Sequence, residues 1–228
     1  MKKKSNKIFA ILIGIAVAYY VLRVSGILVL YAIPSSGSEP TIKSGSFILA
    51  TNLKTPKRGD VITFIFKDRL HPDAPIQELS YIFRLTAIAN DTLEIKKGIV
   101  YVNGKNVDAQ LELKHSYLLS QAQFDKLENP PLDAFNINED TKMVFLEDAI
   151  AKKYALENKQ FIEDKGIEND FIKEKYQQNW NKDHFGPLVI PEGKIFVLGD
   201  NRDDARDSRT IGLINASAIT GVHWVTLF

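Results

Sequence analysis

The side chains of this sequence that could do chemistry are hydroxyls, amines, imidazoles and carboxylates, because its 228 residues include no cysteine. That composition excludes disulfides, thiol nucleophiles and zinc sites built on thiolates. Three serines lie together in the segment Ser35-Ser36-Gly37-Ser38. A serine hydroxyl becomes a nucleophile when a neighbouring base accepts its proton, and without such a base a Ser/Gly segment is typical of a flexible linker. The serines therefore need partners elsewhere in the chain.

A second candidate is the charged run from Asp200 to Arg209, DNRDDARDSR. It does not fit a calcium loop, since Arg202 stands at the third position, Ala205 at the sixth and Ile211 at the twelfth. We interpret the run as a corner held by ion pairs. The four histidines lack the i, i+4 spacing of a zinc helix and are expected at the surface or in strands: His71, His115, His184 and His223. We expect no metal and no cofactor.

These segments carry a resemblance when they are read in order. The sequence IPSSGSEPTI at 33–42 is followed by PKRGDVI at 56–62, YIFR at 81–84, DHFGP at 183–187 and GDNRDDARDSR at 199–209. In order and spacing this resembles the type I signal peptidases, which are membrane-bound serine endopeptidases with a Ser/Lys dyad. The resemblance implies a signal-peptidase-like antiparallel β body. It also implies a site in which burial lowers the pKa of a lysine until its amine can take the serine proton.

The residues at the implied catalytic positions do not fit that chemistry. By resemblance the nucleophile position is Gly37, the position of the base lysine is Phe83, and the serine that would orient the lysine is replaced by Ala205. Ser35 keeps the position of the hydroxyl that contributes to the oxyanion hole. Ser38 stands where the family has methionine and is a possible substitute nucleophile, whose base would have to be found elsewhere. Glycine, phenylalanine and alanine can neither attack a carbonyl nor accept a proton, so the dyad is predicted to be incompetent.

The surrounding structural positions are retained. The resemblance implies that they hold the fold beside the site through carboxylate–guanidinium hydrogen bonds. These residues are Arg84, Asp200, Asn201, Arg202, Asp203, Asp207 and Arg209.

An apolar segment precedes the serines. Residues 1–7 carry four lysines, and residues 8–33 are apolar apart from Arg23 and small or aromatic residues. About 20 apolar residues suffice to cross a bilayer as a helix, and the stretch is too long for the apolar core of a cleaved signal peptide. We expect a cytoplasmic basic tip at 1–7, an uncleaved transmembrane helix at 8–32, and everything after it on the exported or periplasmic side of the cell membrane.

The rest of the chain, 33–228, is predicted to be one mainly β exported domain. Apolar runs at 46–50, 60–66, 80–87, 92–95, 98–102, 188–190, 194–198 and 218–227 are bounded by turn residues and predict strands. Asn103-Gly104 is typical of a tight hairpin. An inserted region at about 106–182, polar and charged from 118 on, is predicted to be partly helical. Leu146, Ala149, Ile150 and Tyr154 follow helical spacing there, and Ser120 could cap a further turn.

The replacements predict a membrane-anchored member of the secretion pathway that binds signal peptides, preproteins or an active paralogue without cutting. Two alternatives stay open. One is a working signal peptidase with a relocated nucleophile such as Ser38, and the other is a non-enzymatic assembly or scaffold subunit that holds a partner through its insertion. The lipid bilayer is an expected partner. Nucleic acid is not, since a net charge of +1 offers no case for a strongly basic face.

Overall fold

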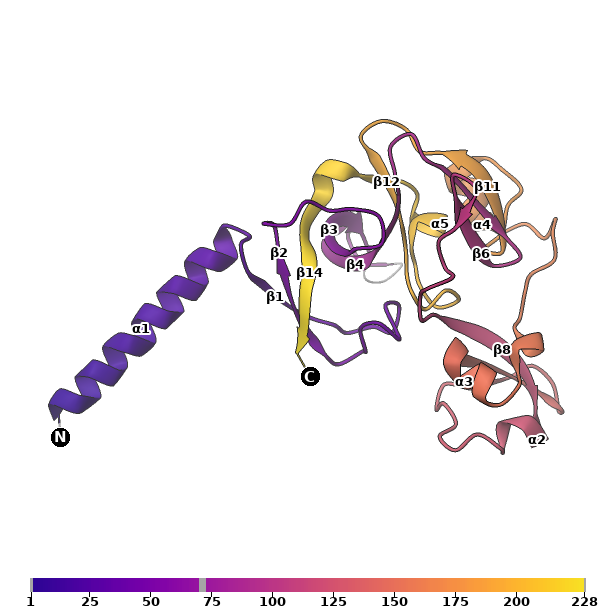
Figure 1. Cartoon of the computed structure of the whole chain (residues 1–228), viewed down its shortest axis with the longest axis horizontal. Helices are drawn as coiled ribbons and strands as arrows, with labels where there is room; N and C mark the ends of the chain where they lie inside the picture. Colours follow the sequence, from indigo (N-terminus) through magenta and orange to yellow (C-terminus); the bar gives the residue numbers. More distant parts are fainter. Residues whose placement is uncertain (1, 70–72, 228) are drawn as a thin grey trace.

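The computed structural model describes residues 2–69 and 73–227, and side chains from residue 7 onward, so His71 lies outside the described residues. The chain begins with a long helix, α1 (Lys2–Val24), which extends away from a β body (Figure 1). Residues 7–24 of this helix have a mean hydropathy of 1.9 and are not buried by the rest of the chain. By length and composition α1 is able to cross a membrane.

The helix ends earlier than the expected 8–32. After Val24 the chain turns at Gly26, which has a φ of 73°, and residues 29–32 form strand β1 (Val29–Ala32). Apolar composition alone cannot separate a helix from the strand that follows it. Residues 29–32 form a strand and not a helical turn because β1 pairs with β2 (Phe47–Thr51) along its whole length. Asn52 also ties the turn down, since its side-chain amide donates to the carbonyl of Ser25.

The main sheet has seven strands, each antiparallel to its neighbours, in the order β1-β2-β14-β3-β4-β12-β13. Its remaining members are β3 (Val61–Asp68), β4 (Gln77–Ile88), β12 (Lys194–Leu198), β13 (Ile214–Asn215) and β14 (Ile219–Leu227). Short helices α5 (Ser208–Ile211) and η2 (Ala216–Ala218) connect the last strands. The C-terminal strand β14 lies between β2 and β3, so the two ends of the body are joined in one sheet. This architecture confirms the mainly antiparallel β prediction.

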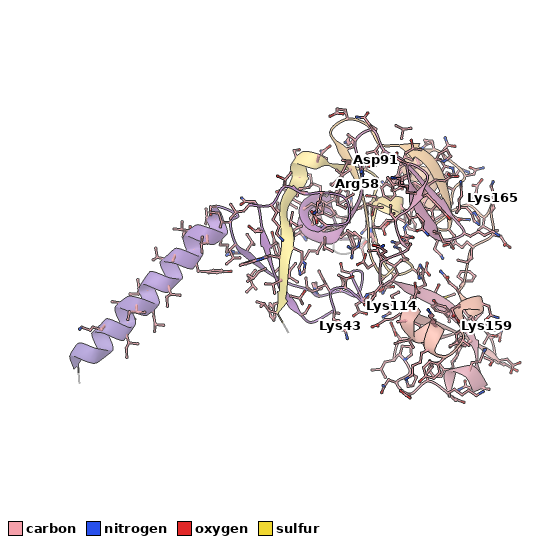
Figure 2. The ribbon with its side chains drawn as sticks, viewed as in Figure 1. Lys43, Arg58, Asp91, Lys114, Lys159 and Lys165 are labelled. Carbon is pink, nitrogen blue, oxygen red and sulfur yellow. The ribbon has the colours of Figure 1, made fainter. Side chains whose placement is uncertain are left out.

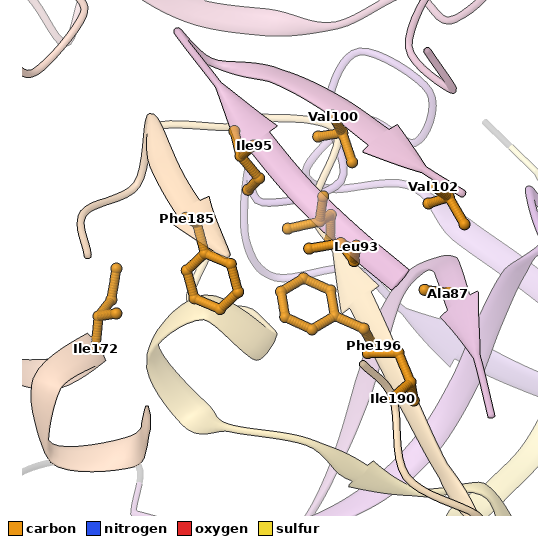
Figure 3. Packing of buried hydrophobic residues seen from close by; sticks show 10 residues of the cluster. Ala87, Leu93, Ile95, Val100, Val102, Ile172, Phe185, Ile190 and Phe196 are labelled. Carbon is orange, nitrogen blue, oxygen red and sulfur yellow. The ribbon is translucent and has the colours of Figure 1, made fainter. Parts of the chain in front are cut away.

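A second sheet shares a core with β4 and β12 of the main sheet and with helix α4 (Asp170–Tyr176). Its order is β11-β5-β6-β7, with β5 (Thr92–Lys96), β6 (Ile99–Val102), β7 (Lys105–Asn106) and β11 (His184–Val189). Figure 3 shows Phe185 and Phe196 facing each other in this core, below Leu93 and Ile95. Asn103 and Gly104, with φ of 52° and 76°, make the expected β6–β7 hairpin turn, because both accept the left-handed backbone.

The insertion forms a small unit with a separate core. Its sheet has the order β8-β10-β9, with β8 (Lys114–Ser120), β9 (Phe135–Asn136) and β10 (Thr141–Glu147), and it carries α2 (Gln121–Phe124), α3 (Asp148–Lys153) and η1 (Glu157–Lys159). Ser120 caps α2 as predicted. Leu146 was expected in a helix but lies at the end of β10, because its backbone pairs with His115 before α3 begins. Helix α4 leads back to the body.

Candidate functional site

Three residues far apart in the sequence meet at one point. Gly37 lies in the loop after β1, Phe83 in β4, and Ala205 in the turn between β12 and α5. A Cβ atom built on Gly37 would lie 3.2 Å from Cε1 of Phe83 and 3.7 Å from Cβ of Ala205. The positions that the sequence assigned to nucleophile, base and orienting serine therefore share one small space. Their side chains leave no hydroxyl, amine or carboxylate at these three positions.

Phe83 occupies this space as part of the apolar core. Its side chain is buried, and its ring lies 5.9 Å from that of Tyr81 and 6.4 Å from that of Phe64, centroid to centroid. An aromatic side chain in such surroundings is stabilised by burial and by tilted ring contacts. A lysine there would lose its hydration and hold its charge only at a cost, which is the condition for a neutral amine. The surroundings thus suit either residue, but the phenylalanine brings no proton acceptor.

The backbone around the point is closely packed. Gly199, at the end of β12, lies so near that an added Cβ would sit 2.2 Å from Cβ of Ala205 and 2.4 Å from the carbonyl oxygen of Gly37. The amide of Asn201 donates to that same carbonyl at 3.2 Å. Any side chain at position 199 would push the loop bearing Gly37 away from the sheet. The glycine therefore allows the approach of the loop to the end of β12.

The three serines of the loop have different environments. Ser35 is exposed, and the hydroxyl of Ser36 donates to the carboxylate of Asp204. The hydroxyl of Ser38 is buried and donates to the carbonyl of Ile82 at 2.8 Å. In this arrangement the proton of Ser38 goes to a backbone carbonyl and not to a basic side chain. Its use as a nucleophile would first require that hydrogen bond to break.

A network of arginines and aspartates surrounds the loop. Nε of Arg84 donates to Oδ1 of Asp200 at 2.8 Å, and the hydroxyl of Thr41 donates to the other carboxylate oxygen. The second nitrogen of Arg84, Nη1, reaches the carbonyl of Gly59 at 2.6 Å. This set ties the loop, β4 and the turn before β3 together. Bidentate pairs of this kind combine charge with fixed geometry.

Two further arginines of the run are almost fully buried. Arg202 binds Asp108 with both terminal nitrogens, at 2.8 and 2.6 Å, and Arg209 binds Asp207. Burial lowers the pKa of Arg209, but the adjacent Asp207 carboxylate more than offsets this, and the net shift is upward. The corner contains two buried arginine–aspartate ion pairs. The sequence could not indicate that the partner of Arg202 is Asp108, because it lies in a distant loop.

The insertion touches the same site through residues that the sequence analysis did not single out. Lys114 binds Glu39 of the serine loop at 2.8 Å, and both side chains are largely buried. The backbone amide and hydroxyl of Ser116 both donate to Asp203. Lys182 bridges Asp203 and Asp183 at 2.7 Å each. Burial raises the pKa of Asp203, but the opposing effects of Lys182 and Ser116 are together larger, so the net shift of this pKa is downward.

The sheets meet at another ion pair. Arg58, in the turn before β3, binds Asp91 with Nε at 2.6 Å and Nη2 at 2.7 Å, and Figure 2 shows the two residues side by side. Asn90, the residue before Asp91, adopts a left-handed backbone with a φ of 69°. Among residues 2–69 and 73–227, no group of three or more histidine, aspartate or glutamate side chains is placed to hold a metal ion. Around the apolar contact of Gly37, Phe83 and Ala205, the arginines of the network are paired with aspartates.

The sequence of this chain is similar to those of known proteins. A family model described as "Signal peptidase, peptidase S26" matches residues 5–228. Signal peptidase I of Aquifex aeolicus is 27% identical over 100% of this chain and 84% of its own length. Signal peptidase IB of Staphylococcus aureus is 28% identical over 92% and 84%. A crystal structure of a signal peptidase I from Enterococcus faecalis is 21% identical, covers 74% of this chain and 97% of its own, and gives a TM-score of 0.34. With a family model matched over almost its whole length, the chain belongs to the signal peptidase family, peptidase S26.

Proposed function

We propose that this protein is a membrane-anchored signal peptidase homologue that binds the signal peptides of exported preproteins without cleaving them. The observation that carries the proposal is the meeting of Gly37, Phe83 and Ala205 at one point, with a Cβ on the first only 3.2 Å from the ring of the second. Loss of both a nucleophile and its base removes nearly all covalent catalysis. Family membership supplies the substrate class, which is a preprotein with a signal peptide.

The proposal includes a topology. Helix α1 anchors the protein, the lysines at its start stay in the cytoplasm, and the β body lies on the exported side. A signal peptide is itself an apolar segment that enters the bilayer. A binding site on an anchored body therefore meets its ligand close to the membrane.

The test uses the full-length protein in liposomes and a fluorescent preprotein segment that spans a cleavage site. We expect saturable binding, measured by anisotropy, and no cleavage product above the level of protein-free liposomes. Cleavage that disappears in a Ser38→Ala variant would contradict the proposal and favour the relocated nucleophile. Absence of binding at any protein concentration would also contradict it.

A restored variant tests the origin of the inactivity. Gly37→Ser, Ser38→Met, Phe83→Lys and Ala205→Ser together should give measurable cleavage of the same segment. The four changes belong together because a serine at position 37 would clash with the ring of Phe83. A matched control carries the same changes with Phe83→Met in place of Phe83→Lys, which removes the ring but supplies no amine, and we expect it to be inactive. Equal activity of the two variants would refute the assignment of position 83 to the base.

A further inference from the structure

A groove of about 760 Å³ opens beside the proposed site. Ala205 lines it, together with apolar side chains from the end of β3, from the residue before β4 and from helices α4 and α5. Those apolar side chains are Phe66, Ile76, Phe171 and Ile211. Its volume lies within the range of sites that enclose small ligands or peptide side chains. Helix α4 belongs to the insertion, so the inserted region builds one wall of a groove that Ala205 also lines.

Two of the apolar side chains that line this α4 groove are largely exposed to solvent. Phe171 is 67% exposed and Ile76 is 60% exposed, although the next residue of α4, Ile172, is completely buried in the core. The helix is thus anchored through Ile172 and presents Phe171 outward. Large apolar side chains held open on both sides of a groove are typical of a binding surface.

Most of the charged side chains that line the groove are engaged within the protein. Asp68 accepts from Arg206 at 2.9 Å and from the hydroxyl of Tyr81, and Lys175 binds Glu174 at 2.6 Å. Paired charges select weakly for a charged ligand, because each ionic group has a partner of its own. Recognition in the groove therefore depends on apolar contact, which suits a peptide segment with an aliphatic or aromatic side chain.

We propose that the α4 groove binds the first residues of the mature part of a preprotein, an inference that rests on the proposed function. Helix α1 leaves the body on one side, and α4 and α5 lie on the other (Figure 1). The signal peptide must approach from the side of the membrane helix. A chain that continues past position 37 and away from the membrane then meets Ala205, which is one of the residues that line the groove. The mature residues can extend from there along the groove toward Phe171, which also lines it.

The test compares two fluorescent peptides on the full-length protein in liposomes. One ends at the signal peptide cleavage site, and the other continues with about eight mature residues that include a phenylalanine. Burial of that side chain should make the longer peptide bind about tenfold more tightly. Phe171→Asp should remove this gain and leave the binding of the short peptide unchanged. The matched control is Phe135→Asp, at an apolar position on β9 that is 56% exposed and away from the groove, and it should keep the gain.

A photocrosslinking measurement supports the same distinction. A benzoylphenylalanine in the mature part should label the segment that contains Phe171, whereas one in the signal part should not. If both peptides bind equally well and Phe171→Asp changes neither, the groove inference is overturned and the proposed function stands. If neither peptide binds, the proposed function fails and the groove inference fails with it.

Discussion

Adding one methyl group at position 37 should destabilise the protein through a single contact. In Gly37→Ala the new Cβ would lie 3.2 Å from Cε1 of Phe83, inside the 3.5–4.0 Å at which carbon atoms attract each other. Overpacking of a core costs about 1–3 kcal/mol. Part of this is offset, by about 0.4–1 kcal/mol, because alanine restricts the unfolded chain more than glycine. The net loss should be about 0.5–2 kcal/mol.

The assay is thermal unfolding of the full-length protein in detergent, followed by tryptophan fluorescence. For a chain of this size, about 1 kcal/mol corresponds to a Tm shift of about 2–4 °C, so Gly37→Ala should lower Tm by about 2–6 °C. Phe83→Leu removes the atom that the methyl group would meet. In the Phe83→Leu background only the restriction of the unfolded chain remains, so Gly37→Ala should raise Tm by about 1–4 °C. The Phe83→Leu single variant supplies the reference for its own cavity cost.

The double-mutant cycle makes the reasoning refutable. Residues in contact show coupling, whereas distant residues add independently. We expect coupling of about 1 kcal/mol between positions 37 and 83. An equal loss of Tm from Gly37→Ala in both backgrounds would mean that the methyl group meets something other than the ring. The assignment of a shared space to the two positions would then be wrong.

Two further predictions concern the ion pairs. Asp207→Asn leaves the buried guanidinium of Arg209 without its counter-charge, so the free energy of unfolding should fall by about 3–5 kcal/mol, measured by urea unfolding; a loss below about 1 kcal/mol would contradict this account. For Asp91, burial raises the pKa, but the opposing effects of Arg58 and of the other hydrogen bonds to its carboxylate are together larger. The pKa of Asp91 in the folded protein therefore lies below its unfolded value near 3.8. Its stabilising contribution is therefore complete above that value and is lost as the pH falls through the folded pKa. Asp91→Asn should flatten the acid limb of a plot of Tm against pH, and an unchanged acid limb would exclude the pair as its cause.

The sequence predicts those features of the fold that depend on local pattern. Strands β3, β4 and β12 follow from apolar runs between turn residues, and the turn at Asn103-Gly104 follows from the backbone that these two residues tolerate. Pairing partners are not local. The end of α1 at Val24 depends on β1 finding β2, and the position of Leu146 in a strand depends on its pairing with β8. Both segments are apolar enough for either structure.

In the candidate site, too, features that depend on contacts between distant segments could not be predicted from local pattern. Motif order placed Gly37, Phe83 and Ala205 together through a resemblance, but no periodicity or spacing in one sequence indicates that they touch. The partners supplied by the insertion were missed. Lys114 and Glu39 are 75 residues apart, and each is an ordinary charged residue in its own segment. Only the register that brings β8 beside the turn at Asn201 makes them neighbours.

The packing at the site implies that its three replacements act as a unit. A serine at position 37 would meet the ring of Phe83, and Cβ of Ala205 lies close to both Gly37 and Gly199, so a larger side chain at 205 has little room while the ring is present. A lysine at position 83 without its serine partners would be a buried amine with no orienting hydrogen bond. Each single reversion is therefore worse packed or less satisfied than the present arrangement. Under the proposed function, cleavage would require the four changes together. The poorer packing of each single change is then a physical reason for the site to keep its present, apolar state.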